Sequence, residues 1–184
     1  MKRAAFFAVF ALAACAPAAE RAAAPAEPIP LRNAGFEAPA RPGERCPVEW
    51  GCTMHADPDS FRFTLDSAQP AEGKQSLCIE RVTPEPWAIA AQSVQARPLR
   101  GRKLRFSIAI RGERLSGAGA GPWVLVNGAQ GLLMNEERPE RVGGQWQRRS
   151  IEFVMPAQAE FLEVGATLLG AGRACIDDVR LEAA

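Results

Sequence analysis

Four segments of this chain alternate apolar and polar residues with a period of two. The clearest is KLRFSIAIR (103–111), whose apolar side chains are Leu104, Phe106, Ile108 and Ile110. The same alternation recurs in FRFTLD (61–66), SIEFVM (150–155) and FLEVGATL (161–168). A period of two puts successive side chains on opposite faces of a β-strand. The pattern therefore predicts half-buried strands and argues against amphipathic helices in these segments.

Turn sequences rich in glycine and proline separate these segments, namely PAEGKQ, RPLRG, SGAGAGP, RVGGQ and LGAGR. Short strands at fairly regular spacing, interrupted by such turns, are typical of sandwiches and jelly rolls. No segment after residue 30 shows the apolar stripe of an amphipathic helix. We therefore expect an all-β fold, an antiparallel β-sandwich or jelly roll, in which SGAGAGP forms a hairpin loop.

The first 30 residues differ in composition from the rest. MKRAAFFAVFALAAC begins with two cations, continues with an apolar run and ends at Cys15, which is the order of an export signal. The apolar run is shorter than the roughly 20 residues that a membrane-spanning helix needs. The ending LAAC resembles the lipobox of bacterial lipoproteins, whose cysteine is lipidated and begins the mature chain. An ordinary signal peptide that happens to contain a cysteine is the alternative.

The lipobox resemblance implies a signal peptide over residues 1–14 and a palmitate-bearing Cys15. In Gram-negative lipoproteins an aspartate after the cysteine favours the inner membrane, so Ala16 implies an outer-membrane lipoprotein of the cell envelope, held to the membrane by its lipid alone. Residues 16–30 consist mainly of Ala, Pro and Glu, a composition typical of an extended tether. We therefore expect one folded domain over residues 31–184.

Four cysteines remain after Cys15, and an even number in an exported chain predicts disulfides. Four cysteines allow three pairings, of which we favour Cys46–Cys52 across CPVEWGC and Cys78–Cys175 between two strands. A zinc site formed by Cys46, Cys52 and His55 is the alternative. Its cysteine spacing is wider than the usual two to four residues, and the chain contains one histidine.

Charge and residue types argue against several other functions. The formal net charge is +1 with acids and bases interspersed, so the chain lacks the basic surface that nucleic acid requires. His55 is the one histidine, and no Gly-x-Ser-x-Gly motif accompanies it, so a Ser-His-acid triad is not expected. SGAGAGP lacks the Lys-Ser/Thr of a phosphate-binding loop. We expect no enzymatic activity.

A series of motifs in fixed order resembles a known fold family. These are NAGFE, EGKQSLCIE, RGRKLRFSIAIRGE, QWQRRSIEFVMP and IDDVRLE, spread over residues 33–182. Their order resembles the galactose-binding-like jelly roll of the carbohydrate-binding modules that flank xylanases. LLMNEERPERVGGQW and ATLLGAGRACIDDV also resemble accessory jelly rolls of bacterial peptidases and esterases. Unlike the sugar-binding members, this chain contains no tyrosine.

The adjacent aspartates of GRACIDDVRLE, Asp177 and Asp178, raise a question of role. Neighbouring strand residues point to opposite faces, whereas two glycosidase carboxylates flank one bond about 5 to 10 Å apart. The pair is therefore not expected to be catalytic. One aspartate must share the inward phase of Val179 and Leu181, unless a bulge moves it. A carboxylate near the core needs several N–H donors or a cation.

Two roles remain for these aspartates. The resemblance to carbohydrate-binding modules implies a structural calcium between the last and first strands, held by Glu37, backbone oxygens of EGKQS and Asp177 or Asp178. The simpler role, which we favour, is that the aspartates accept hydrogen bonds from loop N–H groups without a metal.

The four tryptophans are the candidate ligand contacts, because sugar C–H groups pack on aromatic rings. Trp146 is expected to fill the core, and Trp50 to be buried under the Cys46–Cys52 disulfide. Trp87 and Trp123 are expected at strand starts near loops, with Asn135 and Arg138 as polar partners.

The sequence thus favours a non-catalytic lipoprotein that binds a glycan or envelope polysaccharide. The alternative is a structural lipoprotein that contacts another envelope protein and binds no sugar. If Trp87 and Trp123 line one groove, the first is favoured; if both are buried, the second is favoured.

Overall fold

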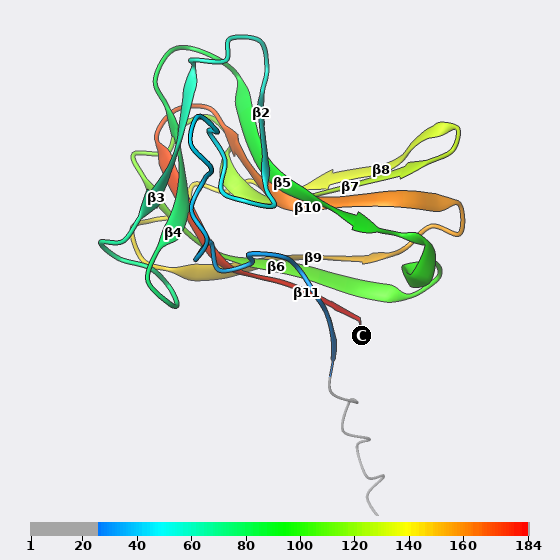
Figure 1. Cartoon of the computed structure of the whole chain (residues 1–184). Coiled ribbons are helices and arrows are strands. Elements are labelled where there is room, and N and C mark those ends of the chain that lie inside the picture. Colours follow the sequence, from blue (N-terminus) through cyan, green and yellow to red (C-terminus); the bar gives the residue numbers. More distant parts are fainter. Residues whose placement is uncertain (1–25, 184) are drawn as a thin grey trace, which may run out of the picture.

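The computed structural model describes residues 26–183, which form two antiparallel sheets packed face to face (Figure 1). The six-stranded sheet has the order β3-β4-β11-β6-β9, with β1 beside the last residues of β11. Its strands are β1 (Glu27–Ile29), β3 (Phe61–Asp66), β4 (Ser76–Arg81), β6 (Lys103–Glu113), β9 (Gln147–Val154) and β11 (Arg173–Ala183).

The five-stranded sheet has the order β2-β5-β10-β7-β8. Its strands are β2 (Gly51–Met54), β5 (Trp87–Gln95), β7 (Gly119–Gly128), β8 (Gly131–Glu137) and β10 (Ala159–Leu169). Within residues 26–183 the single helix is a 3₁₀ turn, η1 (Arg97–Leu99), and no helix there is long and apolar enough to cross a membrane. The predicted all-β sandwich is therefore confirmed.

The alternating segments form the core as predicted. The inward residues of β6 are fully buried, as are those of β10 apart from a trace of exposure at Ala166. They are Leu104, Phe106, Ile108, Ile110, Leu162, Val164, Ala166 and Leu168. In β3 the burial weakens along the strand: Phe61 is buried, but Phe63 and Leu65 are only half-buried. This difference arises because β3 is the edge of its sheet.

Two predicted boundaries are wrong. Residues 119–122 of SGAGAGP belong to β7 rather than to a loop, so Trp123 lies inside the strand. Glu27–Ile29 pairs with β11, so the folded part starts before Leu31 and the predicted tether cannot extend to residue 30. Cys15, the signal peptide and most of the tether lie outside the described residues.

Both disulfides are present with the pairing favoured from the sequence, Cys46–Cys52 and Cys78–Cys175. The second joins directly opposed residues of β4 and β11. Their neighbours Leu77 and Ile176 point into the core, so these cysteines lie on the outer face of the six-stranded sheet. Because the cysteine sulfurs are bonded to each other, the zinc alternative with His55 is wrong.

Candidate functional site

The outer face of the five-stranded sheet carries a groove whose floor is made of small residues. Gly51 lies opposite Ala91, and Ala91 lies opposite Gly165, so the three form a row across β2, β5 and β10. Trp123 of β7 is the next member of this row. A Cβ at position 165 would lie 2.1 Å from the backbone oxygen of Ala90, so only glycine fits there. The row leaves a trough in the middle of the sheet.

Side chains from the neighbouring rows form the two sides of this trough. Thr53 and Ile89 are opposed on one side, with Trp87 at the start of β5. Ser93 and Glu163 are opposed on the other. The cavity has a volume of about 500 Å³, and Glu49 and Trp50 also line it. One side is therefore mainly apolar and the other polar and acidic. We refer to this cavity as the sheet groove.

Trp87 and Trp123 both line the sheet groove, as the glycan-binding hypothesis requires. Trp87 is half-buried, and the ring of His55 meets its edge at 6.0 Å between centroids. Trp123 is 7% exposed, and its Nε1 donates a hydrogen bond to Asn135 Oδ1 at 2.9 Å. The Trp123 ring is thus held in place and almost fully covered, whereas Trp87 has more of its surface exposed.

The other predicted partners have different positions. Asn135 orients Trp123 rather than lining the groove, and Arg138 forms an ion pair with Glu136. Trp50 is buried as expected and packs on Phe36 at 4.7 Å, yet it also borders the groove.

Trp146 does not fill the core. It is half-buried on the outer face of the six-stranded sheet, where it stacks over Arg111 at 5.4 Å. Its Nε1 donates to the backbone oxygen of Gln69 in the β3–β4 loop. This prediction failed because Trp146 precedes β9 and therefore does not share the inward phase of Ile151 and Phe153.

Sequence reasoning missed the two acidic residues of the groove, Glu49 and Glu163. Glu49 precedes β2 and pairs with Arg32 at 3.1 Å. Glu163 is half-buried on β10, and within residues 26–183 no cation or hydrogen-bond donor pairs with its carboxylate. The period-two pattern of β10 does place Glu163 on the outward face, but only the cross-strand register places it beside Trp123 and Ser93.

Asp177 accepts hydrogen bonds from loop N–H groups. Its Oδ2 accepts from the backbone N–H groups of Ala71 and Glu72 at 2.8 and 3.0 Å, and its Oδ1 accepts from that of Asp178. Burial raises the pKa of the Asp177 carboxyl above its ordinary value, and these three hydrogen bonds oppose that rise. The carboxylate thus ties the β3–β4 loop onto β11.

A β-bulge begins directly after Asp177. Asp177 lies opposite Ala109 and Arg180 opposite Ser107, so two residues of β11 oppose Ile108 alone. Asp178 takes up a positive φ of 43° there. Its carboxylate forms ion pairs with Arg148 and Arg180. The bulge turns Asp177 outward while Val179 and Leu181 stay in the core. The sequence analysis allowed for such a bulge as the way in which an aspartate could leave the inward phase.

The expected calcium ligands have other partners. Glu37 accepts hydrogen bonds from the backbone N–H groups of Lys74 and Gln75, Asp177 is held by three N–H groups, and Asp178 by two guanidinium groups. In the part of the chain that the structure describes, the one close set of metal-ligand types is Asp66, Cys78 and Cys175, and its cysteines form a disulfide. These partners favour the hydrogen-bonding role of the aspartates. Glu37, Glu72 and Asp178 also line one cavity of about 220 Å³, so the structural calcium stays a prediction.

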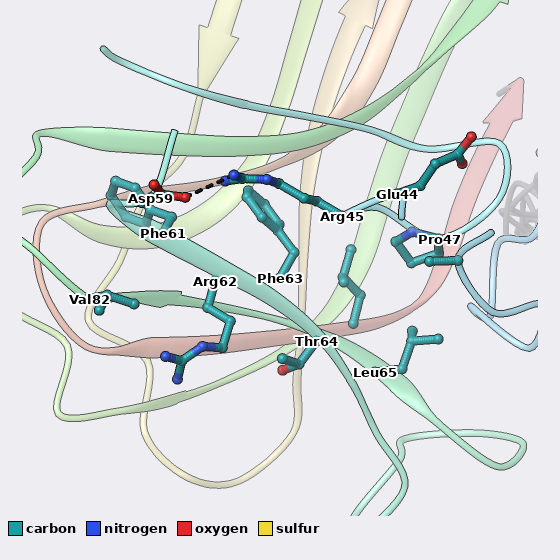
Figure 2. A pocket seen from close by; sticks show the side chains of 12 residues that line it. Glu44, Arg45, Pro47, Asp59, Phe61, Arg62, Phe63, Thr64, Leu65 and Val82 are labelled. Carbon is teal, nitrogen blue, oxygen red and sulfur yellow. Dashed lines mark hydrogen bonds and ion pairs between the residues drawn. The ribbon is translucent and has the colours of Figure 1, made fainter. Parts of the chain in front are cut away.

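A second cavity, of about 480 Å³, follows the free edge of β3. Five consecutive residues, 61–65, line it, together with the loop that precedes β2. Figure 2 shows Arg45 extending above Phe63 toward Asp59, with which it pairs at 2.8 Å. We refer to this cavity as the β3-edge cavity.

Comparison with known proteins identifies the fold class. No protein-family model matches the sequence, and no curated protein matches it. The structure is similar to the xylan-binding domain CBM22-1 of Paenibacillus barcinonensis Xyn10C, with a TM-score of 0.58, 15% identity, and coverage of 81% of this chain and 90% of that one. It is also similar to the C-terminal family 22 carbohydrate-binding module of Clostridium thermocellum Xyn10B. That match has a TM-score of 0.52, 18% identity, and coverage of 74% and 86%.

A third similar structure is the enzymatically active domain of tailspike protein 4 of bacteriophage CBA120. Its TM-score is 0.59 at 14% identity, and the match covers 74% of this chain but only 20% of that chain. At these identities the likeness establishes the fold. The chain is an antiparallel β-sandwich of the jelly-roll type found in carbohydrate-binding modules.

Proposed function

We propose that this protein is a non-catalytic envelope lipoprotein whose jelly-roll domain binds a glycan in the sheet groove. One observation carries the proposal: Trp87 and Trp123, from different strands, line the same groove.

The groove combines the contacts that a sugar needs. Sugar C–H groups pack on the half-buried ring of Trp87. The hydroxyl groups of Thr53 and Ser93 donate or accept hydrogen bonds, and the carboxylate of Glu163 accepts them. The small floor residues let the sugar ring approach the sheet. The resemblance to xylan-binding domains supports the same ligand class.

A glycan-array screen of the full chain in detergent, followed by calorimetry on the best ligand, tests this function. We expect Trp87→Ala to lower the affinity for the glycan at least tenfold, because the variant loses the ring on which the sugar packs. A tenfold loss of affinity corresponds to about 1.4 kcal/mol of binding free energy. Trp146→Ala is the matched control, since Trp146 lies on the other sheet. Equal affinity in wild type and Trp87→Ala would rule out the sheet groove.

The lipoprotein part of the proposal rests on LAAC and the Ala/Pro-rich segment that follows it. We propose that palmitate on Cys15 holds the domain at the outer membrane. Cys15→Ser is expected to abolish palmitate labelling and to release the protein from membranes. Labelling that persists in this variant would contradict lipidation at Cys15.

A protein-contact function is the second candidate, and the β3-edge cavity is the observation that favours it. Unpaired main-chain groups at a sheet edge accept an added strand from a partner. Half-buried Phe63 and Leu65 would contact such a strand. Absence of any glycan ligand, together with cross-linking of an envelope protein at this edge, would favour this function.

A further inference from the structure

The strands that build the sheet groove contain no cationic residue. β2, β5, β7, β8 and β10 have no lysine or arginine, but β8 and β10 contribute four glutamates. These are Glu136, Glu137, Glu160 and Glu163. Glu163 lines the groove and Glu137 lies opposite Trp123 on the same outer face, whereas Glu136 lies opposite the core residue Val124. The outer face at the groove thus has acidic side chains and no cation from its own strands.

The cations that border this sheet are engaged in ion pairs. Arg32 pairs with Glu49, and Arg138 pairs with Glu136. Arg97 and Arg100 both pair with Glu160.

Of these four glutamates, Glu137 and Glu163 have no ion pair among the described residues, and Glu163 is the one that lines the groove. Its carboxylate lies half-buried beside the groove floor, and within residues 26–183 it has no ion pair and no hydrogen-bond donor. The carboxylate oxygens of Glu163 are therefore free to accept hydrogen bonds from a ligand donor placed in the groove.

We infer that the sheet groove selects glycans by charge, and that its preferred ligand is a chain of amino sugars with free amino groups. This inference rests on the proposed glycan-binding function. Glu163 is its specificity-determining residue. A protonated amine donates charge-assisted hydrogen bonds to a carboxylate, and these are about twice as strong as neutral ones.

The same carboxylates oppose acidic sugars. A uronate carboxylate in the groove would lie near Glu163 and Glu49 in a partly water-excluded site, where repulsion between like charges is stronger than in bulk water. The neutral N-acetylated form of the same amino sugar keeps its hydroxyl donors but loses the ammonium. It should therefore bind with intermediate affinity.

Three oligosaccharides of equal length test this inference on the full chain in detergent: glucosamine, N-acetylglucosamine and galacturonate oligomers. Calorimetry at one pH, about 6, measures the affinity of each oligomer. We expect glucosamine to bind about tenfold more tightly than N-acetylglucosamine, and galacturonate not to bind. Added salt should weaken the glucosamine complex more than the N-acetylglucosamine complex.

Glu163→Gln keeps the shape of the side chain and removes its charge. It should reduce the glucosamine preference to less than threefold while leaving the affinity for N-acetylglucosamine nearly unchanged. Glu136→Gln, on the same sheet but already paired with Arg138, is the matched control and should keep the preference.

The outcomes separate this inference from the proposed function. If all three oligomers bind alike and Trp87→Ala abolishes their binding, charge selection is wrong and glycan binding stands. If galacturonate binds best, the inference is also overturned. If no oligomer or array glycan binds, the proposed function itself fails.

Discussion

The two sheets of this sandwich divide their charges unequally. The six-stranded sheet contains nine cationic residues in its strands, whereas the five-stranded sheet contains none. The nine are Arg62, Arg81, Lys103, Arg105, Arg111, Arg148, Arg149, Arg173 and Arg180. Seven of the nine lie on the outer face of the sheet, whereas Arg81 and Arg149 lie opposite the buried residues Phe61 and Ile108.

The outer face of the six-stranded sheet is filled by internal contacts. Asp66 pairs with Arg111 and Arg173, Trp146 stacks on Arg111, and the β3–β4 loop hydrogen-bonds to Asp177. On the five-stranded sheet the corresponding area is the open sheet groove. Charge pairing thus stabilises one face, while the other keeps polar groups available for a ligand. Changes to the first face should alter stability, and changes to the second should alter binding.

Removing the Cys78–Cys175 disulfide should give the largest loss of stability. The bond closes a separation of 97 residues, and the chain-entropy model assigns a loop of this length about 4.7 kcal/mol. Urea unfolding of the Cys78→Ala/Cys175→Ala variant measures the loss.

The matched control is Cys46→Ala/Cys52→Ala, whose separation of 6 residues gives about 2.4 kcal/mol. Glycan affinity of the folded Cys78→Ala/Cys175→Ala variant should stay unchanged. A folded variant with weakened affinity would show that the two faces are coupled.

Asp177→Asn should lower the free energy of unfolding by about 2 kcal/mol. Both carboxylate oxygens accept from backbone N–H groups, so the amide NH₂ of asparagine faces a donor and leaves it without an acceptor. Asp178→Asn should cost less than about 1 kcal/mol, since the guanidinium groups of Arg148 and Arg180 remain accessible to water. Thermal unfolding of both variants compares them. A larger loss in Asp178→Asn would reverse our assignment of the main support of the loop to Asp177.

The sequence was sufficient for the layers of the fold, but not for the groove. Periodicity along one strand predicts which side chains of β6 and β10 are buried, because burial depends on the face alone. The groove depends on cross-strand register, which brings Gly51, Ala91 and Gly165 into one row from three distant segments. The bulge at Asp178 likewise follows from loop contacts rather than from local pattern. The absence of Lys and Arg from five strands was visible in the sequence, but its meaning depends on knowing that these strands share a sheet.

Acid stability should depend on Asp66 and Asp177 in opposite directions. A backbone hydrogen bond from Ala68, then the Arg173 side chain, lower the pKa of Asp66, so its contribution is present above about pH 4 and lost as the pH falls. The raised pKa of Asp177 gives a contribution that is present in acid and lost as the pH rises through that pKa.

Asp66→Asn should therefore make the loss of stability between pH 5 and pH 3 shallower, and Asp177→Asn should make it steeper. Urea unfolding at several pH values measures the two slopes. Parallel slopes in wild type and both variants would contradict these pKa directions.

Chelation of divalent cations should have the smallest effect, with no change in melting temperature. A calcium ion at a hundredfold excess over its Kd would stabilise the fold by about 2.7 kcal/mol, and 1 kcal/mol moves the midpoint of a domain of this size by about 2 to 4 °C. Such a shift is easily measured, so its absence is informative. We expect no shift in melting temperature, because two guanidinium groups already pair with Asp178 and three N–H groups hold Asp177.

In Arg148→Gln/Arg180→Gln the Asp178 carboxylate loses both cations. A calcium-dependent rise in melting temperature in that variant alone would show that arginine takes the place of the metal. A chelator-induced fall in wild type would show instead that calcium, not internal charge pairing, completes the outer face of the six-stranded sheet.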